Sequence, residues 1–287
     1  KGLLIALDLE KAFDEVNHEF LWILLDKYKF PRAFIKSVQG LYSSASSRIL
    51  FNGFLTSPIK VNSSVRQGCP LSMALFVLYV EPLIRMIYSS INGVLIDNVF
   101  IKIIAYADDI NILVINDHEF DTVLSIINYF SIYSKVRLNL KKSQFLRINN
   151  CISGPQKLVE VDKLKILGVV FTPSFKNIVN ENYDDLIRKM KFTVKNHTKR
   201  RLNFIQRVQI LNCYILSKIW YVAQIFPADN KHIAQIRTIC QQFIFHSHIF
   251  KVQMQQLYLP AKKAGLYLCT EAIAYNLLYF DSGSIYH

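Results

Sequence analysis

The sequence lacks most features of secreted and membrane-spanning proteins. Its five cysteines form no C-x-x-C pair, and their odd number argues against a closed set of disulfides. No secretory signal opens the chain, and its longest stretch without a charged residue, 67–80, is shorter than the roughly 18 residues that cross a bilayer. We therefore expect a soluble protein of a reducing, intracellular compartment, with no membrane partner.

Acidic residues are also scarce. The chain has 21 Asp and Glu against 34 Lys and Arg, a formal charge of +13, which favours a polyanionic partner such as nucleic acid. No acidic residue occurs from Leu186 to Ala228. The basic residues of that stretch are Arg188, Lys189, Lys191, Lys195, Lys199, Arg200, Arg201, Arg207 and Lys218.

The apolar pattern predicts an α+β fold followed by helices. With 52% hydrophobic residues, the chain can form one large or two modest domains. The predicted strands and hairpins are 3–7, 48–61 around Asn52-Gly53, 99–105, 110–115, 144–148 and 166–171. The predicted helices are 19–28, 70–91, 117–135 capped by Asp117, 181–197, 203–225, 230–247 and 269–280. This order predicts an antiparallel sheet with helices on one face, ending near Pro173, and then an all-α part.

Three acids end predicted strands. Asp8 follows the first strand, and Asp108 and Asp109 lie at the tip of a hairpin that we expect to be buried. Carboxylates in such places are solvated, paired or metal-bound, because an isolated buried charge is strongly destabilising. Three of them at one sheet edge would suit Mg²⁺. The alternative is that Asp108 and Asp109 form only a polar turn.

Motifs around these acids resemble those of reverse transcriptases. Ala6-Leu7-Asp8-Leu9-Glu10-Lys11-Ala12-Phe13-Asp14 is similar to the first palm motif, Arg66-Gln67-Gly68-Cys69-Pro70-Leu71-Ser72 to the second and Tyr106-Ala107-Asp108-Asp109 to the third. Leu138-Asn139-Leu140-Lys141-Lys142-Ser143 resembles the fourth motif, and Leu167-Gly168-Val169 the primer-grip hairpin. All five occur in the family's order, which makes chance agreement remote. The second motif and the segments 200–207 and 216–221 resemble the branch of non-LTR retrotransposons, of the long interspersed element type.

This resemblance implies an RNA-directed DNA polymerase that adds deoxynucleoside triphosphates to a DNA primer on an RNA template. Residues 1–173 would form the palm, 174–228 a basic thumb and 229–287 the start of a connector. Asp8, Asp108 and Asp109 would hold two Mg²⁺ ions, with Mn²⁺ as a substitute. Lys142 would protonate the leaving pyrophosphate, although it could also be a solvated loop lysine.

The resemblance also implies substrate-binding residues. Phe13 would exclude a 2′-hydroxyl from the sugar site, unless it is simply a core phenylalanine. Gln67 and Gly68 would lie against the nascent base pair, or form a turn into the next helix. Tyr106 would lie near the substrate, and Leu167 and Gly168 would grip the primer.

The basic residues of the predicted thumb have helical spacing. Arg188, Lys191, Lys195 and Lys199 recur every three to four residues, and a stripe of this kind can follow a phosphate backbone without reading sequence. A solvated face is the alternative, but the absence of acids in this stretch argues against a salt-bridged helix. Further nucleic-acid contacts are expected from Arg200, Arg201 and Arg207.

Residue 1 is Lys and a strand begins almost at once, so we expect a piece of a longer polyprotein, with the family's finger residues upstream. The resemblance implies synthesis in the nucleus at nicked chromosomal DNA and a cytoplasmic ribonucleoprotein. One competing hypothesis is a non-catalytic, retrotransposon-derived fragment that binds nucleic acid. Others are an RNA-dependent RNA polymerase and a maturase. Oligomeric state is left open.

Overall fold

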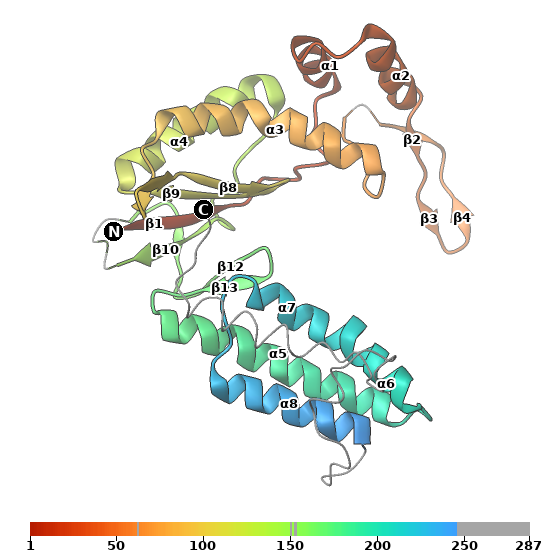
Figure 1. Ribbon diagram of the computed structural model, residues 1–287. Coiled ribbons are helices and arrows are strands. Elements are labelled where there is room, and N and C mark those ends of the chain that lie inside the picture. Colours follow the sequence, from red (N-terminus) through yellow and green to blue (C-terminus); the bar gives the residue numbers. More distant parts are fainter. Residues whose placement is uncertain (62, 150, 152–153, 246–287) are drawn as a thin grey trace. The chain divides into compact units, whose positions relative to one another are not determined.

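The computed structural model describes residues 1–245 except 62, 150 and 152–153 (Figure 1). Contacts divide the chain into two compact units, Lys1–Leu167 and Gly168–His287. This division falls before Pro173, where the sequence suggested a boundary. The palm, thumb and connector ranges stay predictions, and the helix expected at 269–280 lies outside the described residues.

A five-stranded sheet forms the centre of the first unit. Its order is β11-β10-β1-β9-β8. The strands are β1 (Gly2–Leu7), β8 (Ile103–Tyr106), β9 (Asp109–Val114), β10 (Gln144–Ile148) and β11 (Val159–Glu160). β1 is antiparallel to both neighbours, β9 and β10, while β11 pairs parallel with β10. β1 lies in the middle and is buried along almost its whole length, which explains why its sequence is a continuous apolar run.

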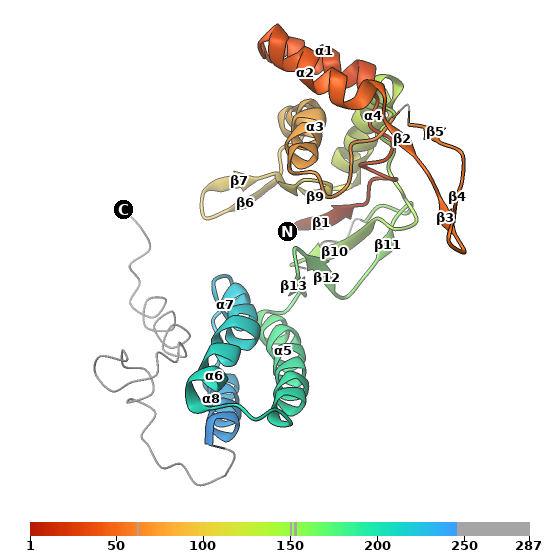
Figure 2. The same cartoon turned by 90° about the vertical axis from the view of Figure 1, so that its right-hand side faces the viewer.

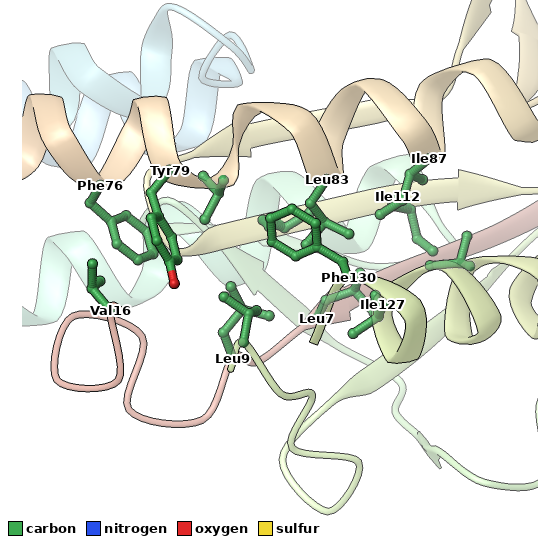
Figure 3. Packing of buried hydrophobic residues seen from close by; sticks show 14 of the residues in the cluster. Leu7, Leu9, Val16, Phe76, Tyr79, Leu83, Ile87, Ile112, Ile127 and Phe130 are labelled. Atoms are coloured by element: carbon green, nitrogen blue, oxygen red, sulfur yellow. The ribbon is translucent and has the colours of Figure 1, made fainter. Parts of the chain in front are cut away.

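Two long helices, α3 (Pro70–Ser90) and α4 (Asp117–Ser134), lie on one face of this sheet (Figure 1). Figure 3 shows Phe76 and Leu83 of α3 in the same cluster as Ile112 of β9 and Phe130 of α4. The buried hydroxyl of Tyr79 donates to the carbonyl of Ser134 and accepts the N–H of Asn17 at 2.9 Å. Burial raises the pKa of Tyr79 to about 12. The layer of helices on one face agrees with the prediction, whereas the sheet is not wholly antiparallel as expected, because β11 pairs parallel with β10.

Among the described helices, α3 is the one long and apolar enough to cross a membrane by length and composition alone. The search for a stretch without charged residues did not find the whole of this helix, because the helix contains Glu81 and Arg85, which form an ion pair at 2.6 Å. Its apolar side chains contribute much of the core cluster, which accounts for its composition. A core helix of a soluble protein passes the same test.

The first unit also carries smaller elements beside the sheet (Figure 2). These are α1 (His18–Lys27), α2 (Arg32–Ser43), β2 (Ser46–Ser47), β3 (Leu50–Phe51), β4 (Phe54–Leu55), β5 (Ile59–Lys60), β6 (Val94–Ile96), β7 (Val99–Ile101) and β12 (Leu164–Ile166). Asn52 and Gly53 have φ of 48° and 83°, so the predicted hairpin turn is confirmed. The sequence analysis did not predict α2.

Three expectations about these elements are wrong. The strand expected at 99–105 is two strands, β7 and β8, interrupted at Lys102. The cap of α4 is Asn116, whose side chain accepts the N–H of Glu119, rather than Asp117. The strand expected at 166–171 is interrupted by a turn at Leu167 and Gly168, whose φ values are 47° and 87°. This turn agrees with the hairpin expected at Leu167-Gly168-Val169, whereas a primer grip by Leu167 and Gly168 stays a prediction.

Helices dominate the second unit. They are α5 (Phe175–Thr198), α6 (Phe204–Ile210), the π-helical segment η1 (Leu211–Leu216), α7 (Ser217–Ala223) and α8 (Asn230–Phe245), after the short strand β13 (Val169–Phe171). The core between α5 and the other helices contains Tyr183, Leu211 and Phe243. Helices predicted at 181–197 and 203–225 are confirmed, with α5 beginning earlier and the middle helix passing through a π-helical segment. The helix predicted at 230–247 is confirmed as far as residue 245, where the described residues end.

Candidate active site

Sheet register brings the three predicted acids to one end of the sheet. Leu7, the last residue of β1, pairs with Ile110 of β9, so Asp8 follows on β1 beside the position of Asp109. Tyr106 pairs with Asp109 across the turn between β8 and β9, and Asp108 lies within that turn. The sequence thus predicted the right strand ends.

The electrostatics of the hairpin agree with this proximity. Partial desolvation of the Asp109 carboxyl, and then the negative charges of Asp108 and Asp8, raise its pKa. Nevertheless, no group of three acidic, His or Cys side chains within the described residues is arranged to hold a metal ion. The metal role of Asp8, Asp108 and Asp109 therefore stays a prediction.

The hairpin is less buried than expected. β9 is buried from Ile110 to Val114, but Ile104 and Tyr106 of β8 are 43% and 65% exposed. Asp108 and Asp109 are exposed as well. β8 is the edge strand of the sheet, so one of its sides has no neighbouring strand to cover it.

The backbone around Asp8 is held by the loop after α4. Its N–H donates to Ser143 Oγ at 3.0 Å, and its carbonyl accepts the N–H of Asn139 at 2.8 Å. The N–H of Glu10 donates to the carbonyl of Arg137 at 2.9 Å. Ser143 is fully buried and donates its own hydroxyl proton to the Asn139 carbonyl at 2.8 Å. The sequence comparison included Ser143 in the fourth motif but gave it no role.

A cleft of about 680 Å³ lies beside Asp8. Lys142 lines it, and its role toward the leaving pyrophosphate stays a prediction. Other cations line it too, namely Lys11, Lys135 and Arg137, together with Glu10 and Glu15. Lys135 and Arg137 had no sequence signal, because their place in the cleft depends on the left-handed turn at Lys135, where φ is 60°, and on the hydrogen bond between the carbonyl of Arg137 and the N–H of Glu10. Four cations against the three carboxylates of Asp8, Glu10 and Glu15 leave the cleft with a small positive excess, which can accommodate an anionic, polyphosphate-like ligand.

A second cavity, of about 520 Å³, gathers the predicted substrate residues. Phe13, Gln67 and Gly68 all line it, with Cys69 at the N-terminus of α3. The Phe13 ring is stacked on Phe76, with centroids 4.4 Å apart. Phe13 is therefore both a packed residue and a wall of this cavity.

The loop of the second motif, residues 66–69, contains a backbone conformation that glycine adopts readily. Gly68 has φ of 81°, and no atom lies within 4 Å of the place where a side chain would begin. Gln67 Nε2 is 3.4 Å from Asp14 Oδ1. Backbone N–H groups of Leu71 and Ser72 lower the pKa of the Cys69 thiol, a feature that the sequence analysis missed. Tyr106 lines neither this cavity nor the cleft at Asp8.

The basic stripe lies on the exposed side of α5. Lys191 and Lys195 are exposed, as is Lys199 at the end of the helix. Arg188 is exposed too, but it forms an ion pair with Asp185, as does Lys189. The expectation of a helix without salt bridges is wrong here, because Asp185 lies just before the acid-free stretch.

Arg207 differs from the other predicted nucleic-acid contacts. Its half-buried guanidinium donates to the carbonyls of Leu202, Phe243 and Ile244, which joins α6 to α8. Burial lowers the pKa of this guanidinium. Its Nε and Nη1 groups thus donate within the unit, whereas Arg200 and Arg201 are exposed between α5 and α6.

Comparison with known sequences identifies the family. The sequence profile of the family described as "Reverse transcriptase (RNA-dependent DNA polymerase)" matches residues 1–171. The chain belongs to the reverse transcriptase family. The resemblance that its motifs carry is therefore confirmed over the whole of the first unit and the start of the second.

Relatives of this reverse transcriptase are proteins of transposable elements. The "Transposon TX1 uncharacterized 149 kDa protein" of Xenopus laevis is 27% identical over 84% of this chain and 19% of its own length. The Pol polyprotein of element R2DM from Drosophila melanogaster is 33% identical over 36% of the chain and 10% of its own length. That of an R2 element from Popillia japonica is 28% identical over 56% of the chain and 23% of its own. These non-LTR elements confirm the expected branch, and the matched chain spans less than a quarter of each relative.

One solved structure, a telomerase from Candida albicans in complex with a fragment of telomeric RNA, also aligns with this chain. The alignment covers 98% of this chain and 44% of the telomerase, with 11% identity and a TM-score of 0.43.

Proposed function

We propose that this chain is the palm and thumb of an RNA-directed DNA polymerase that adds deoxynucleotides to a primer 3′-hydroxyl. The observation that carries the proposal is the register of β1 and β9, which puts Asp8 beside Asp109 at the end of one sheet in a chain of this family. An RNA template, a DNA primer and deoxynucleoside triphosphates are the proposed ligands. Nuclear synthesis and a cytoplasmic ribonucleoprotein are proposed from the same family relationship.

The acids fit a divalent metal by their chemistry. Asp8, Asp108 and Asp109 supply hard carboxylate oxygens. The pKa of Asp109 is raised first by burial and then by the negative charges of Asp108 and Asp8, and a bound cation would relieve the second effect. Two Mg²⁺ or Mn²⁺ ions bound there would lower the pKa of the primer hydroxyl and neutralise the triphosphate.

The two cavities suit the two ends of a nucleotide. Phe13, Gln67 and Gly68 would bind the sugar and base in the cavity that they line. Lys142, with Lys135 and Arg137, would bind the phosphates in the cleft at Asp8. Lys142 would also give its proton to the departing pyrophosphate. In the second unit, Lys191, Lys195 and Lys199 would contact the phosphates of the primer and template without reading their sequence.

Single-nucleotide extension of a DNA primer on an RNA template, measured with the intact protein, tests the proposal. Asp8→Asn and Asp108→Asn should abolish extension while primer-template binding persists, because they remove charge at the reacting end and leave the basic residues. Asp97→Asn is the matched control, since Asp97 also lies in an exposed hairpin turn, between β6 and β7. Undiminished extension by Asp8→Asn would overturn the proposal, and binding without extension by the wild type would favour the non-catalytic alternative.

A further inference from the structure

A second acid-free stretch of the chain lies in the first unit. No Asp or Glu occurs from residue 27 to residue 80, between Asp26 and Glu81, which is longer than the acid-free stretch in α5 to α7. Its basic residues are Lys27, Lys29, Arg32, Lys36, Arg48, Lys60 and Arg66. This stretch includes α2 and the strands β2 to β5.

The outer part of this stretch is a narrow antiparallel ribbon, residues 46–60. Ser46 pairs with Lys60 and Ser47 with Ile59 at its base, and Leu50 pairs with Leu55 and Phe51 with Phe54 near its tip. Figure 1 shows β3 and β4 extending away from the helices of the first unit. The Asn52-Gly53 turn gives the tip a defined backbone.

Large apolar side chains of the ribbon are in contact with water. Phe51 and Phe54 are each 77% exposed, and Leu50 and Leu55 are 68% and 61% exposed. None of them belongs to the core cluster of the first unit. Phe51 and Phe54 form a cross-strand pair, so their rings share one face of the ribbon, and the two leucines share the other. An exposed apolar group of this size marks a surface that binds a partner.

The positive charge of the ribbon favours a polyanionic partner. Arg48 and Lys60 lie at the base of the ribbon, both are exposed, and neither forms an ion pair within the part of the chain that the structure describes. Exposed aromatic rings on the same surface element as unpaired cations are a combination that binds single-stranded nucleic acid, with bases stacked on the rings and phosphates at the cations. We propose that the ribbon is a binding site for single-stranded nucleic acid, with Phe51 and Phe54 stacking on bases and Arg48 and Lys60 contacting phosphates.

This site is separate from the proposed catalytic one. No residue of the ribbon lines the cleft at Asp8 or the cavity at Phe13. Binding at the ribbon does not depend on metal or nucleotide, so it can be measured whether or not the chain polymerises. An anionic lipid surface or a second copy of the chain could also cover apolar residues, and both are outcomes of the test below.

Fluorescence anisotropy with a labelled single-stranded RNA, titrated into the intact protein over a range of salt, is the first measurement. Phe51→Ala with Phe54→Ala should weaken binding by at least about tenfold, because stacking contributes about 1–3 kcal/mol per base, and should leave the salt dependence unchanged. Arg48→Ala with Lys60→Ala should flatten the plot of log affinity against log salt by about 1.4, at roughly 0.7 for each contact to a single strand.

Matched controls remove the same chemistry elsewhere in the first unit. Tyr129→Ala with Tyr133→Ala removes an exposed aromatic pair from α4, and Arg85→Ala with Lys157→Ala removes two cations that pair with acids. Both controls should bind as the wild type does. Folding of each variant is checked by its thermal unfolding, which should not change because the substituted side chains are exposed.

The second measurement is photocrosslinking to an oligonucleotide that contains 5-iodouracil, followed by peptide mapping. Crosslinks within 46–60 support the proposal, and their loss in Phe51→Ala with Phe54→Ala supports the stacking role. Unchanged affinity and no crosslink in this segment would overturn it. The proposal would also be overturned if the phenylalanine variants lost binding to anionic vesicles, or dimerisation in sedimentation, with RNA affinity intact. Normal primer extension with lost ribbon binding would separate this site from the proposed polymerase function.

Discussion

The buried hydroxyl of Ser143 accepts the backbone N–H of Asp8 at 3.0 Å, although the two residues are 135 positions apart in the sequence. The same hydroxyl donates to Asn139, whose own N–H returns to the carbonyl of Asp8. Asp8 is therefore held on both sides of its α-carbon by the loop that also carries Lys142. Asp8 lies just after the last residue of β1. The loop after α4 therefore supplies the two backbone hydrogen bonds of Asp8.

Ser143→Ala should impair the proposed active site. The change leaves a part-buried N–H without its acceptor, a loss of about 1–3 kcal/mol, and frees the backbone of Asp8. We expect primer extension to fall about tenfold and its Mg²⁺ midpoint to rise, because Asp8 is no longer held in place. A purely structural role would lower the melting temperature and leave the Mg²⁺ midpoint unchanged. Ser125→Ala, which removes an exposed serine from α4, is the control.

Asp109 should make the protein less stable at neutral pH when no metal is bound. Its pKa is raised in the folded state, so its ionised form is disfavoured there, and folding loses stability as the pH rises through the range between the unfolded and folded pKa values. Asp109→Asn should therefore raise the melting temperature at about pH 7 but not below about pH 3, where the carboxyl is protonated in both states. Thermal unfolding against pH, in the presence of a chelator, measures this.

The same variant tests the metal proposal without any activity assay. Mg²⁺ should raise the melting temperature of the wild type, since a ligand of the folded state stabilises it, and the increase should shrink in Asp109→Asn. Asp97→Asn should retain the full increase. An equal response to Mg²⁺ in all three proteins would remove the metal role from Asp109.

Local sequence signals were sufficient where one element determines its own shape. The apolar run before Asp8 predicted β1, Asn52-Gly53 predicted its hairpin, and Pro70 predicted the start of α3. The order of the motifs indicated the family and the three acids. These acids lie at a strand end and in a turn, which can be predicted without knowing how distant segments pack. These parts of the fold and site were thus accessible from the sequence.

The remainder depends on contacts between distant segments. The role of Ser143 arises from a hydrogen bond to β1, and Arg137 enters the cleft because its carbonyl pairs with Glu10. In the sequence, Arg207 looks like one more cation of a basic stretch. In the structure, its guanidinium donates to two carbonyls of α8, those of Phe243 and Ile244. The exposure of β8 follows from its place at the sheet edge, which the run of apolar residues could not reveal.

Phe13→Val should relax sugar selection if the ring closes the sugar site. Phe13 lines the cavity and is braced by its stack on Phe76, so the wall is rigid enough to reject an added hydroxyl. We expect discrimination between deoxyribonucleotides and ribonucleotides, as the ratio of kcat/KM, to fall by at least about tenfold, or 1.4 kcal/mol. Phe20→Val is the control, because Phe20 is a half-buried ring of the same core that lines neither cavity. An equal loss of rate with both sugars would make Phe13 a packing residue only.

The cations of α5 should determine how strongly duplex binding responds to salt. Lys191, Lys195 and Lys199 are exposed, whereas Arg188 pairs with Asp185, so within the stripe the three lysines are the residues available to phosphates. Replacing them with Ala should flatten the plot of log affinity against log salt by about 2 to 3, at roughly 0.7 to 0.9 for each contact, equally for all sequences. Arg188→Ala should change the slope of this plot less, because Asp185 already offsets the charge of Arg188. Arg207→Ala is expected to act on stability rather than on this slope: it should lower the melting temperature, since it leaves carbonyls of α8 without their donor. If the triple variant keeps the wild-type slope in anisotropy titrations, the stripe is a solvated face and the duplex is bound elsewhere.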